Sequence, residues 1–362
     1  MTELQIQKLL GRKEIDIDLQ EIAAYIDDRV VLVTGAGGSV GSELCRQIGR
    51  FNPKRLLLLG RGEQSIYEIN LECRTRSPKL TATPVIADIR DPGRLRQVFE
   101  EHRPRVIFHT AAHKHLDMIE SFPEEIVKNN IIGTRTVSHL AHEYGAERFV
   151  MISSDKAVRP ACVYGAGKRI SEFQIEGLAR GSDTIFVTVR FGNVLGARGT
   201  IVPLFQKQIR EGGPVTVHPE ATRYFMTIPE AARLVVQSGA IGKDGEIFIF
   251  DMGKPMRILE LAMEMIRLAG MEPGVDIALK FVELRPGDKL HEELLTQTEG
   301  VKSTRHRKIF IAEPDKVDPT SLDEAIDELG TLAEASDRIG IVEKLKEIIP
   351  DLTPSSLWNG RG

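Results

Sequence analysis

The chain has 362 residues, of which 41% are hydrophobic and 28% charged, a composition that excludes a disordered or fibrous protein. Its 48 basic and 52 acidic residues leave a net charge of −4, which offers no basic field to nucleic acid or anionic lipid. No apolar run reaches the ~20 residues of a membrane helix. The N-terminus is too polar for a signal peptide, and the three cysteines form no CxxC pattern. We therefore expect a reduced, cytoplasmic protein without a membrane span.

The first elements in chain order predict the fold class. Residues 1–28 form a mixed leader in which QEIAAYI, at 20–26, predicts a short helix. Short apolar runs follow, most of them separated by helical patterns. They lie at 30–34, 56–59, 85–87, 106–108, 148–152 and 185–189. Strands and helices in alternation predict an α/β fold, a doubly wound, Rossmann-type parallel sheet covered on both faces.

After Phe191 the rhythm loosens into glycine- and proline-rich loops with shorter elements. The pattern predicts a leader over 1–28, a main domain over 29–190, and a smaller, partly interleaved α/β region over 191–315. Residues 316–362 form a C-terminal helical tail. The acidic pattern from about 322 to 349 predicts a solvated amphipathic tail or an oligomer contact.

A glycine-rich segment lies between the first predicted strand and a predicted helix, SELCRQIGRF. Glycines there allow a tight turn and bring backbone N–H groups close to a pyrophosphate at the helix N-terminus. The strand, the glycines and the helix occur in the order that this motif requires. We therefore predict a dinucleotide cofactor bound by Gly35, Gly37, Gly38, Ser39, Val40 and Gly41.

The end of the second predicted strand bears on the choice of cofactor. A carboxylate there binds the ribose of NAD, but this strand ends in Gly60 followed by Arg61. Arginine can pair with a 2′-phosphate, which favours NADP over NAD. The alternative is a solvent-facing arginine, with Glu63 binding the ribose. By analogy with such folds, Asp88 and Ile89 lie beside the adenine, and Ala111 completes the cofactor site.

A tyrosine and two lysines supply candidate chemistry. Tyr164 and Lys168 are four residues apart, so on a helix they share one face. A nearby ammonium lowers a tyrosine pKa from about 10 towards working pH. Such a tyrosine takes a hydroxyl proton while hydride leaves for a nicotinamide.

Ser154, Asp155 and Lys156 follow the predicted strand at 148–152, where the side chains of a parallel sheet face its ligand crevice. A reductase needs only a tyrosine, a lysine and a hydroxyl. The additional Asp–Lys pair provides an acid and a base for eliminating water. A lysine base must be neutral, so Lys156 requires burial or a nearby cation to lower its pKa. The alternative is a surface ion pair at a strand end.

Four strings carry a family resemblance: GAGGSVGSELCRQI, AAHKHLDMIE, SSDKAVRPACVYGAGKR and RYFMTIPEAARLV. They resemble the extended short-chain dehydrogenase/reductase superfamily. More narrowly, they resemble its CapD-like polysaccharide-biosynthesis branch, which contains UDP-N-acetylglucosamine 4,6-dehydratases. The likeness runs from LLGR in the leader to about Thr296. Longer members carry N-terminal membrane helices and some have methionine at the tyrosine position, so the resemblance implies the soluble, tyrosine-bearing type.

The resemblance implies roles for these residues. Tyr164, aided by Lys168 and Ser154, deprotonates the sugar 4-hydroxyl as hydride passes to NADP⁺. Lys156 then removes the proton from carbon 5, and Asp155 protonates the departing 6-hydroxyl. Hydride returns to carbon 6. The substrate-binding residues that the resemblance implies are Lys114, Asn193, Arg198, Gly199, Thr200, Arg223, Arg285 and Glu292.

The resemblance implies that Asn193 and the turn at 198–200 bind the sugar diphosphate and that Glu292 binds the nucleoside. The alternative for each position is a polar or ion-pair residue at the surface. No metal is expected. Related outcomes are a 5,6-dehydratase, a 4-epimerase and a non-catalytic NADP-binding sensor. Both configurations at carbon 5, and both UDP-N-acetylglucosamine and UDP-N-acetylgalactosamine, are compatible with these residues. The superfamily also implies a homo-oligomer, commonly a dimer formed through two helices of the nucleotide domain.

Overall fold

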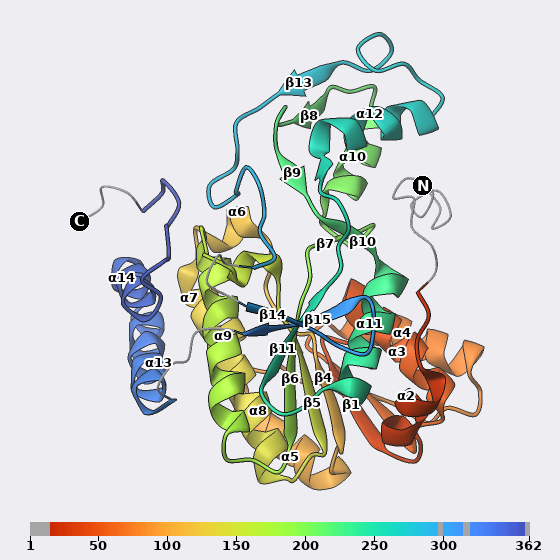
Figure 1. The fold of residues 1–362 in the computed structure, drawn as a ribbon, viewed down its shortest axis with the longest axis vertical. Helices are drawn as coiled ribbons and strands as arrows, with labels where there is room; N and C mark the ends of the chain where they lie inside the picture. The colour runs from red at the N-terminus through yellow and green to blue at the C-terminus, as the bar shows by residue number, and fades with distance from the viewer. Residues whose placement is uncertain (1–14, 296–299, 314–318, 359–362) are drawn as a thin grey trace.

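The structure is a computed structural model that describes residues 15–295, 300–313 and 319–358. Its body is a nine-stranded sheet with helices on both faces, and a smaller lobe lies beyond one end of the strands (Figure 1). In spatial order the strands are β14 (Gly300–Ser303), β15 (Ile309–Glu313), β11 (Glu246–Phe250), β6 (Ile185–Arg190), β5 (Arg148–Ile152), β4 (Val106–His109), β1 (Val30–Thr34), β2 (Arg55–Gly60) and β3 (Ala82–Ile86). The strands from β11 to β3 are parallel, whereas β15 and β14 add an antiparallel edge.

The predicted α/β fold class is confirmed, and all six predicted apolar runs lie in or overlap strands of this sheet. Strands buried on both faces are apolar at every position, which is why these short runs mark them. The least accurate boundary is that of β3, which begins three residues before its predicted run. β3 is an edge strand and contains Pro84, a residue that an edge tolerates and that interrupts the apolar pattern.

Helices cover the two faces of the sheet. One face carries α2 (Leu19–Ile26), α3 (Ser39–Ile48), α4 (Glu63–Arg76) and α11 (Ile228–Ile241). The other face carries α5 (Pro92–His102), α8 (Gly133–Glu143) and α9 (Val163–Ala179). Successive residues of β1 alternate between these layers, since Val31 and Val33 pack on the first and Leu32 on the second.

The described part of the leader, residues 15–28, forms part of the body. Its predicted helix is present as α2, capped by Asp18, whose side chain accepts the N–H groups of Gln20 and Glu21. Ile22 and Ile26 are fully buried, and the Tyr25 hydroxyl donates to the Val236 carbonyl of α11 at 2.6 Å. This segment therefore packs on the helix layer beside β1.

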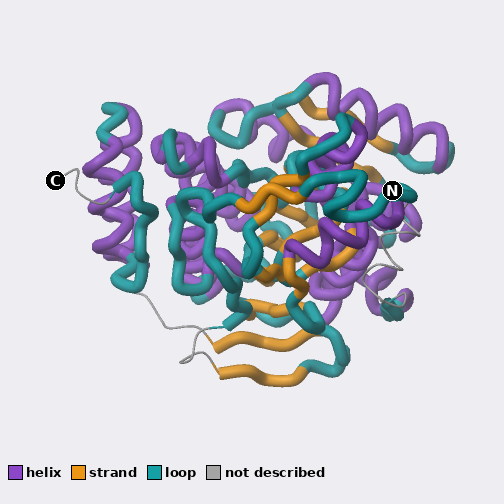
Figure 2. Tube along the Cα trace, turned by 90° about the horizontal axis from the view of Figure 1, so that it is seen from above, coloured by secondary structure: helices purple, strands orange, loops and turns teal. Residues whose placement is uncertain are grey.

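The tail was expected to be a solvated amphipathic segment or an oligomer contact, and the structure packs it against the body of the same chain. Its helices, α13 (Pro319–Glu334) and α14 (Arg338–Ile348), pack on α9 and on the π-helix η2 (Ile126–Ile132). They lie at one side of the body in both views (Figures 1 and 2). Ile326 and Leu345 are fully buried. Most apolar residues of the two helices lie on the face that packs, although Ile339 of α14 is exposed, and the acidic residues lie mainly outside this contact.

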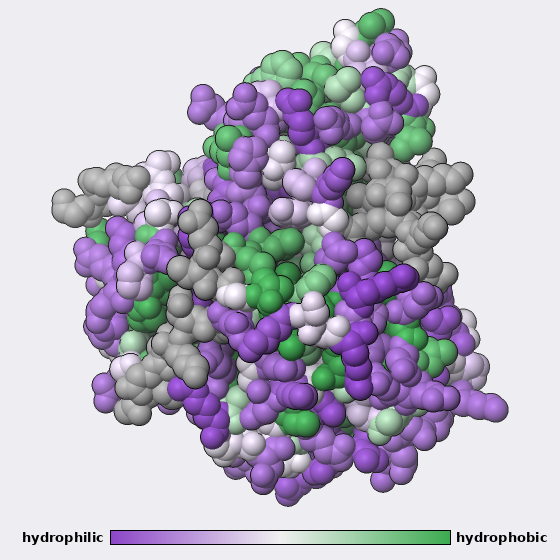
Figure 3. Space-filling view, in the orientation of Figure 1, coloured by the Kyte–Doolittle hydropathy of each residue, from purple (hydrophilic) through white to green (hydrophobic). Residues whose placement is uncertain are grey.

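The smaller lobe has its own apolar core. It contains β7 (Asn193–Leu195), α10 (Ile201–Arg210), β8 (Val215–Val217), β9 (Thr222–Arg223), β10 (Phe225–Thr227), β12 (Met256–Arg257), α12 (Ile258–Leu268) and β13 (Leu279–Phe281). Between β10 and β12 the chain returns to the body to form α11 and β11. The face of the whole molecule drawn in Figure 3 is mainly hydrophilic. In the described part of the chain, no helix is both long and apolar enough to cross a membrane.

Candidate active site

The glycine turn joins β1 to α3. Gly35 has a φ of +67°, and a Cβ on Gly41 would lie 2.2 Å from the Gly35 carbonyl oxygen, so neither position accepts a side chain. A Cβ on Gly37 would lie 2.4 Å from the Ser65 hydroxyl. No side chain caps the N-terminus of α3, which leaves its first N–H groups for a ligand. These features fit a dinucleotide pyrophosphate.

The other expected cofactor residues lie at the carboxyl ends of β2, β3 and β4. The Arg61 side chain is 53% exposed, and its Nη1 is 3.7 Å from Asp88 Oδ2. Asp88 also accepts from Arg90 at 2.8 Å. Ile89 is buried, and the Ala111 backbone lies against Gly35. Arg61 is therefore available to a ligand, with Asp88 its only charged partner in the described residues.

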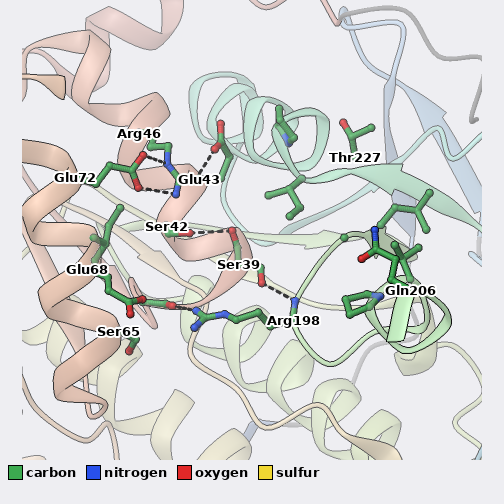
Figure 4. A pocket seen from close by; sticks show the side chains of 18 residues that line it. Ser39, Ser42, Glu43, Arg46, Ser65, Glu68, Glu72, Arg198, Gln206 and Thr227 are labelled. Carbon is green, nitrogen blue, oxygen red and sulfur yellow. Dashed lines mark hydrogen bonds and ion pairs between the residues drawn. The ribbon is translucent and has the colours of Figure 1, made fainter. Parts of the chain in front are cut away.

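Arg198, which the resemblance implied at the sugar diphosphate, contacts the glycine turn in this structure. Its backbone N–H donates to Ser39 Oγ at 3.0 Å and its guanidinium donates to the Gly37 carbonyl, so it covers the glycine turn (Figure 4). Gly199, with a φ of +70°, packs on His115, and Thr200 begins α10. A cavity of about 520 Å³ lies beside this turn between α3, α4 and α10, and no candidate catalytic residue lines it. This turn therefore contacts the glycine turn rather than the candidate acid–base cluster formed by Ser154, Asp155 and Lys156.

The acid–base cluster begins at the end of β5. Asp155 is fully buried, which excludes the alternative of a surface ion pair. Its Oδ1 accepts from Ser154 Oγ at 2.8 Å and from Lys156 Nζ at 3.2 Å. Lys156 Nζ also lies 3.3 Å from Asn193 Oδ1. Two segments of the chain, the end of β5 and β7, thus meet at the Lys156 ammonium group.

The third segment brings Glu292 from the smaller lobe. Its Oε1 lies 3.0 Å from Lys156 Nζ and 3.7 Å from Arg223 Nε. In the described residues, Asp155 Oδ2 and Glu292 Oε2 are buried and accept no hydrogen bond. Buried acceptors without a partner are costly, so these two oxygens mark positions where a ligand hydroxyl fits.

Lys156 does not meet the requirement set for it from the sequence. Burial alone lowers its pKa, but the charges of Asp155 and Glu292 outweigh burial and hold the pKa above its ordinary value. Burial, together with Glu292, raises the pKa of Asp155 despite the opposing charge of Lys156. The lowering that a neutral base requires is therefore absent here, because the two neighbouring carboxylates favour the ammonium form of Lys156.

Tyr164 and Lys168 lie one turn apart on α9, as expected. Burial raises the pKa of Tyr164 to about 12, and the main opposing charge is Lys156 rather than Lys168. Burial lowers the pKa of Lys168 to about 8, and its Nζ donates to the Ile152 carbonyl at 2.9 Å. The expected lowering of the tyrosine pKa by Lys168 is therefore absent, because burial of the phenol outweighs the charges around it.

Two other expected substrate residues lie apart from the cluster. Arg285 is 61% exposed and pairs with Asp288 at 2.9 Å. Lys114 is exposed beside the turn that carries Arg198. Arg223 is buried and reaches Asp288 at 3.3 Å, which links it to the loop that carries Glu292.

Sequence reasoning missed a buried ion network behind the site. Glu172 accepts from Arg190 at 2.8 and 2.7 Å, from Arg169 at 2.9 Å and from Ser153 at 2.6 Å. Against the cost of burial, Arg190 and Arg169 lower the pKa of Glu172 to about 2. The signal available was position: Glu172 follows Lys168 by one helical turn, so it shares the face that carries Tyr164.

The parallel sheet, and the helix that carries Tyr164 and Lys168, place the chain in the class of short-chain dehydrogenase/reductase folds. The family described as "Polysaccharide biosynthesis protein" matches residues 31–314, and the chain belongs to it.

Its relatives include the probable polysaccharide biosynthesis protein EpsC of Bacillus subtilis, 51% identical over 82% of this chain, and CapD of Staphylococcus aureus, 47% identical over 91%. The chain spans about half the length of both, 50% and 55% respectively. A UDP-N-acetylglucosamine 4,6-dehydratase (inverting) of Campylobacter jejuni is 29% identical over 75% of this chain and 78% of its own.

Solved structures share the fold. Pen from Bacillus thuringiensis is 29% identical with a TM-score of 0.73, and the match covers 84% of this chain and 99% of that one. DesIV, a dTDP-glucose 4,6-dehydratase from Streptomyces venezuelae solved with NAD, is 24% identical with a TM-score of 0.65, over 73% and 87% of the two chains.

Proposed function

We propose that the chain is an NADP-dependent UDP-N-acetylglucosamine 4,6-dehydratase. The observation that carries the proposal is the buried Asp155–Lys156 pair, 3.2 Å apart. An acid and a base at this place are what water elimination needs in addition to the tyrosine and lysine of a reductase. The Campylobacter relative of that name supports the substrate.

Gly35, Gly37 and the N-terminus of α3 would hold the cofactor, which would supply a hydride acceptor for carbon 4 and a hydride donor for carbon 6. Tyr164 takes the proton of the 4-hydroxyl. Because its pKa is about 12 in the free protein, this step depends on positive charge nearby, which Lys156 supplies. Lys168 is held by the Ile152 carbonyl behind the tyrosine. The ketone formed at carbon 4 acidifies the proton on carbon 5.

Elimination then requires a neutral base and a protonated acid. Transfer of one proton from Lys156 Nζ to Asp155 Oδ1, across 3.2 Å, produces both forms at once. The neutral amine takes the carbon 5 proton, and the carboxylic acid gives its proton to the departing 6-hydroxyl, which leaves as water. The raised pKa of Asp155 favours this transfer, whereas the raised pKa of Lys156 opposes it, so the proposal requires the bound substrate to shift the balance. Elimination takes one proton from carbon 5 and gives one to the 6-hydroxyl, which leaves the pair as ammonium and carboxylate. As hydride returns to carbon 6, the Lys156 ammonium gives its proton to carbon 5, and the proton that Tyr164 took restores the pair through solvent.

The remaining substrate residues belong to this proposal. Asn193 and Glu292 contact the sugar side of the cluster, and Arg223 holds the diphosphate or uridine. Arg198 and Lys114 lie on the cofactor side. A cytoplasmic location and a homo-oligomer remain predictions; α13 and α14 occupy part of the α9 surface within the chain itself.

Mass spectrometry of the purified chain with UDP-N-acetylglucosamine and NADP⁺ tests the proposal. We expect a product lighter by one water. A 4-epimerase changes no mass, and its reaction uses no acid for the 6-hydroxyl, so the buried Asp155 weighs against it. A cofactor-binding sensor leaves the nucleotide sugar intact. Either of these two results would contradict the dehydratase.

Replacing Arg61 with alanine is expected to weaken NADPH binding by about tenfold and to leave NADH binding unchanged, because one charge-assisted contact to a 2′-phosphate is lost. Fluorescence titration with both cofactors checks this. Glu63→Ala is the matched control. If Glu63→Ala weakens NADH binding and Arg61→Ala affects neither cofactor, the NADP assignment is wrong.

Replacing Asp155 with asparagine keeps the shape of the side chain and removes the acid. We expect dehydration to fall by about 10²–10³-fold, because the 6-hydroxyl then leaves without a proton donor. Rapid-quench analysis with excess enzyme should find the 4-keto sugar that still carries its 6-hydroxyl. Equal loss of ketone formation and dehydration would contradict this role.

A further inference from the structure

Glu120 is a fully buried carboxylate that none of the proposed chemical steps uses. It follows α6 (Leu116–Ile119), and its Oε1 accepts the backbone N–H of Val163 at 2.6 Å. Val163 is the first residue of α9, directly before Tyr164. The N-cap of that helix is Cys162, whose sulfur accepts the N–H of Gly165 at 3.3 Å and is a weak acceptor. The oxygen acceptor at the start of α9 is therefore supplied by Glu120.

The second oxygen of Glu120 is held from the C-terminal side of the chain. Ser355 Oγ donates to Oε2 at 2.7 Å, and Trp358 Nε1 donates to it at 3.2 Å. Two residues earlier than Ser355, the Thr353 N–H donates to the Pro160 carbonyl at 3.0 Å. The segment 353–358 thus contacts both the helix cap and the loop between Lys156 and Tyr164.

The smaller lobe contacts the same place. Lys289 Nζ donates to the Val158 carbonyl at 2.8 Å. Gly287 has a φ of +82°, and a Cβ there would lie 2.8 Å from Cys162 Cβ and 3.3 Å from Glu120 Cδ. The loop that carries Glu292 therefore packs against both Cys162 and Glu120.

We propose that Glu120 is a positioning residue for Tyr164 and that segment 353–358 is the strap that fixes it. The carboxylate joins the catalytic helix, the C-terminal segment and the substrate-lobe loop at one point. An anion at a helix N-terminus is favoured by the aligned peptide dipoles. The strap donors supply hydrogen bonds that a buried carboxylate requires, since burial raises the pKa of Glu120.

Loosening the strap should displace the first turn of α9 without removing a group that touches the substrate. Displacement of a reacting group by about 1 Å can cost about 10²-fold in rate. We expect a smaller effect, about tenfold in kcat, because Val163 and Cys162 keep their own contacts. The KM for the nucleotide sugar should change less than twofold. This kinetic expectation rests on the proposed function.

The test uses the full chain with Ser355→Ala combined with Trp358→Phe, and Ser356→Ala as the matched control, since Ser356 is the exposed neighbour. Hydrogen exchange over 158–168 is the primary readout because it needs no substrate. We expect faster exchange in the double variant and wild-type exchange in the control. Glu120→Gln, which cannot accept at both positions, should reproduce the double variant.

Wild-type exchange over 158–168 in both the double variant and Glu120→Gln would overturn the proposal, whatever the substrate is. Faster exchange without a fall in kcat would also overturn it, since the strap would then not position Tyr164. If the chain turns over no UDP-N-acetylglucosamine, the exchange result still decides the strap, and the failure belongs to the proposed function. The single tryptophan of the chain gives a further check: its emission should shift to longer wavelength in Ser355→Ala alone.

Discussion

Replacing Lys156 with methionine is expected to reduce dehydration by about 10²–10⁴-fold, the usual contribution of a general base. Methionine retains the length of the side chain and removes the amine. Lys156 lies between Asp155 at 3.2 Å and Glu292 at 3.0 Å, so the change also removes the proton that Asp155 needs. Product formation by mass spectrometry measures the loss. NADPH binding should stay at the wild-type value, because the glycine turn is untouched.

Lys156→Arg separates the base from the charge. Arginine keeps a cation between the two carboxylates but does not lose its proton in proteins. If Lys156 acts as a base, the arginine variant is as inactive as the methionine variant. Near wild-type turnover by Lys156→Arg would show that only the positive charge matters, and the proton transfer to Asp155 would be wrong.

Replacing Glu172 with glutamine is expected to destabilise the protein by about 3–5 kcal/mol, because it leaves the guanidinium groups of Arg190 and Arg169 buried with less than their full counter-charge. For a chain of this size, that corresponds to a fall in Tm on the order of 5 °C. Differential scanning calorimetry measures it. The double variant Glu172→Leu with Arg190→Met removes the main pair together and should recover part of the loss. No recovery would contradict the ion-pair explanation.

The same carboxylate predicts a dependence of stability on pH. The pKa of Glu172 is about 2 in the folded chain and ordinarily 4.5. A lowered folded-state pKa adds stability above about pH 4.5, and that stability is lost as the pH falls towards 2. The difference corresponds to roughly 3 kcal/mol. The free energy of unfolding, measured with urea, should therefore fall less between pH 5 and pH 3 in the Glu172→Leu, Arg190→Met variant than in the wild type.

The sequence was sufficient for the sheet and for selecting candidate residues that the structure brings together at the end of β5. Buried parallel strands are apolar throughout, and their carboxyl ends collect the polar residues of a site. That is why the run at 148–152 led directly to Ser154, Asp155 and Lys156. The spacing of Tyr164 and Lys168 was also sufficient to place them on one helix face.

Charge states and long-range contacts were not predictable in the same way. The charge of Lys156 depends on Glu292, which a separate lobe brings to within 3.0 Å. Arg198 was expected at the sugar diphosphate, and its contact with the glycine turn, which follows from the path of the chain after β7, was not foreseen. The tail pattern showed which residues of α13 and α14 are apolar, but not that α9 provides the surface that buries them.

Proton NMR of the purified chain with UDP-N-acetylglucosamine and NADP⁺ in deuterated water tests the central claim most directly. The account predicts a new methyl signal on the sugar with deuterium at carbon 5, because a solvent-exchanged acid–base pair acts at that carbon while hydride returns to carbon 6. An alkene signal instead would show that the reaction stops at a 5,6-unsaturated sugar. An unchanged sugar spectrum with NADP bound would contradict the dehydratase.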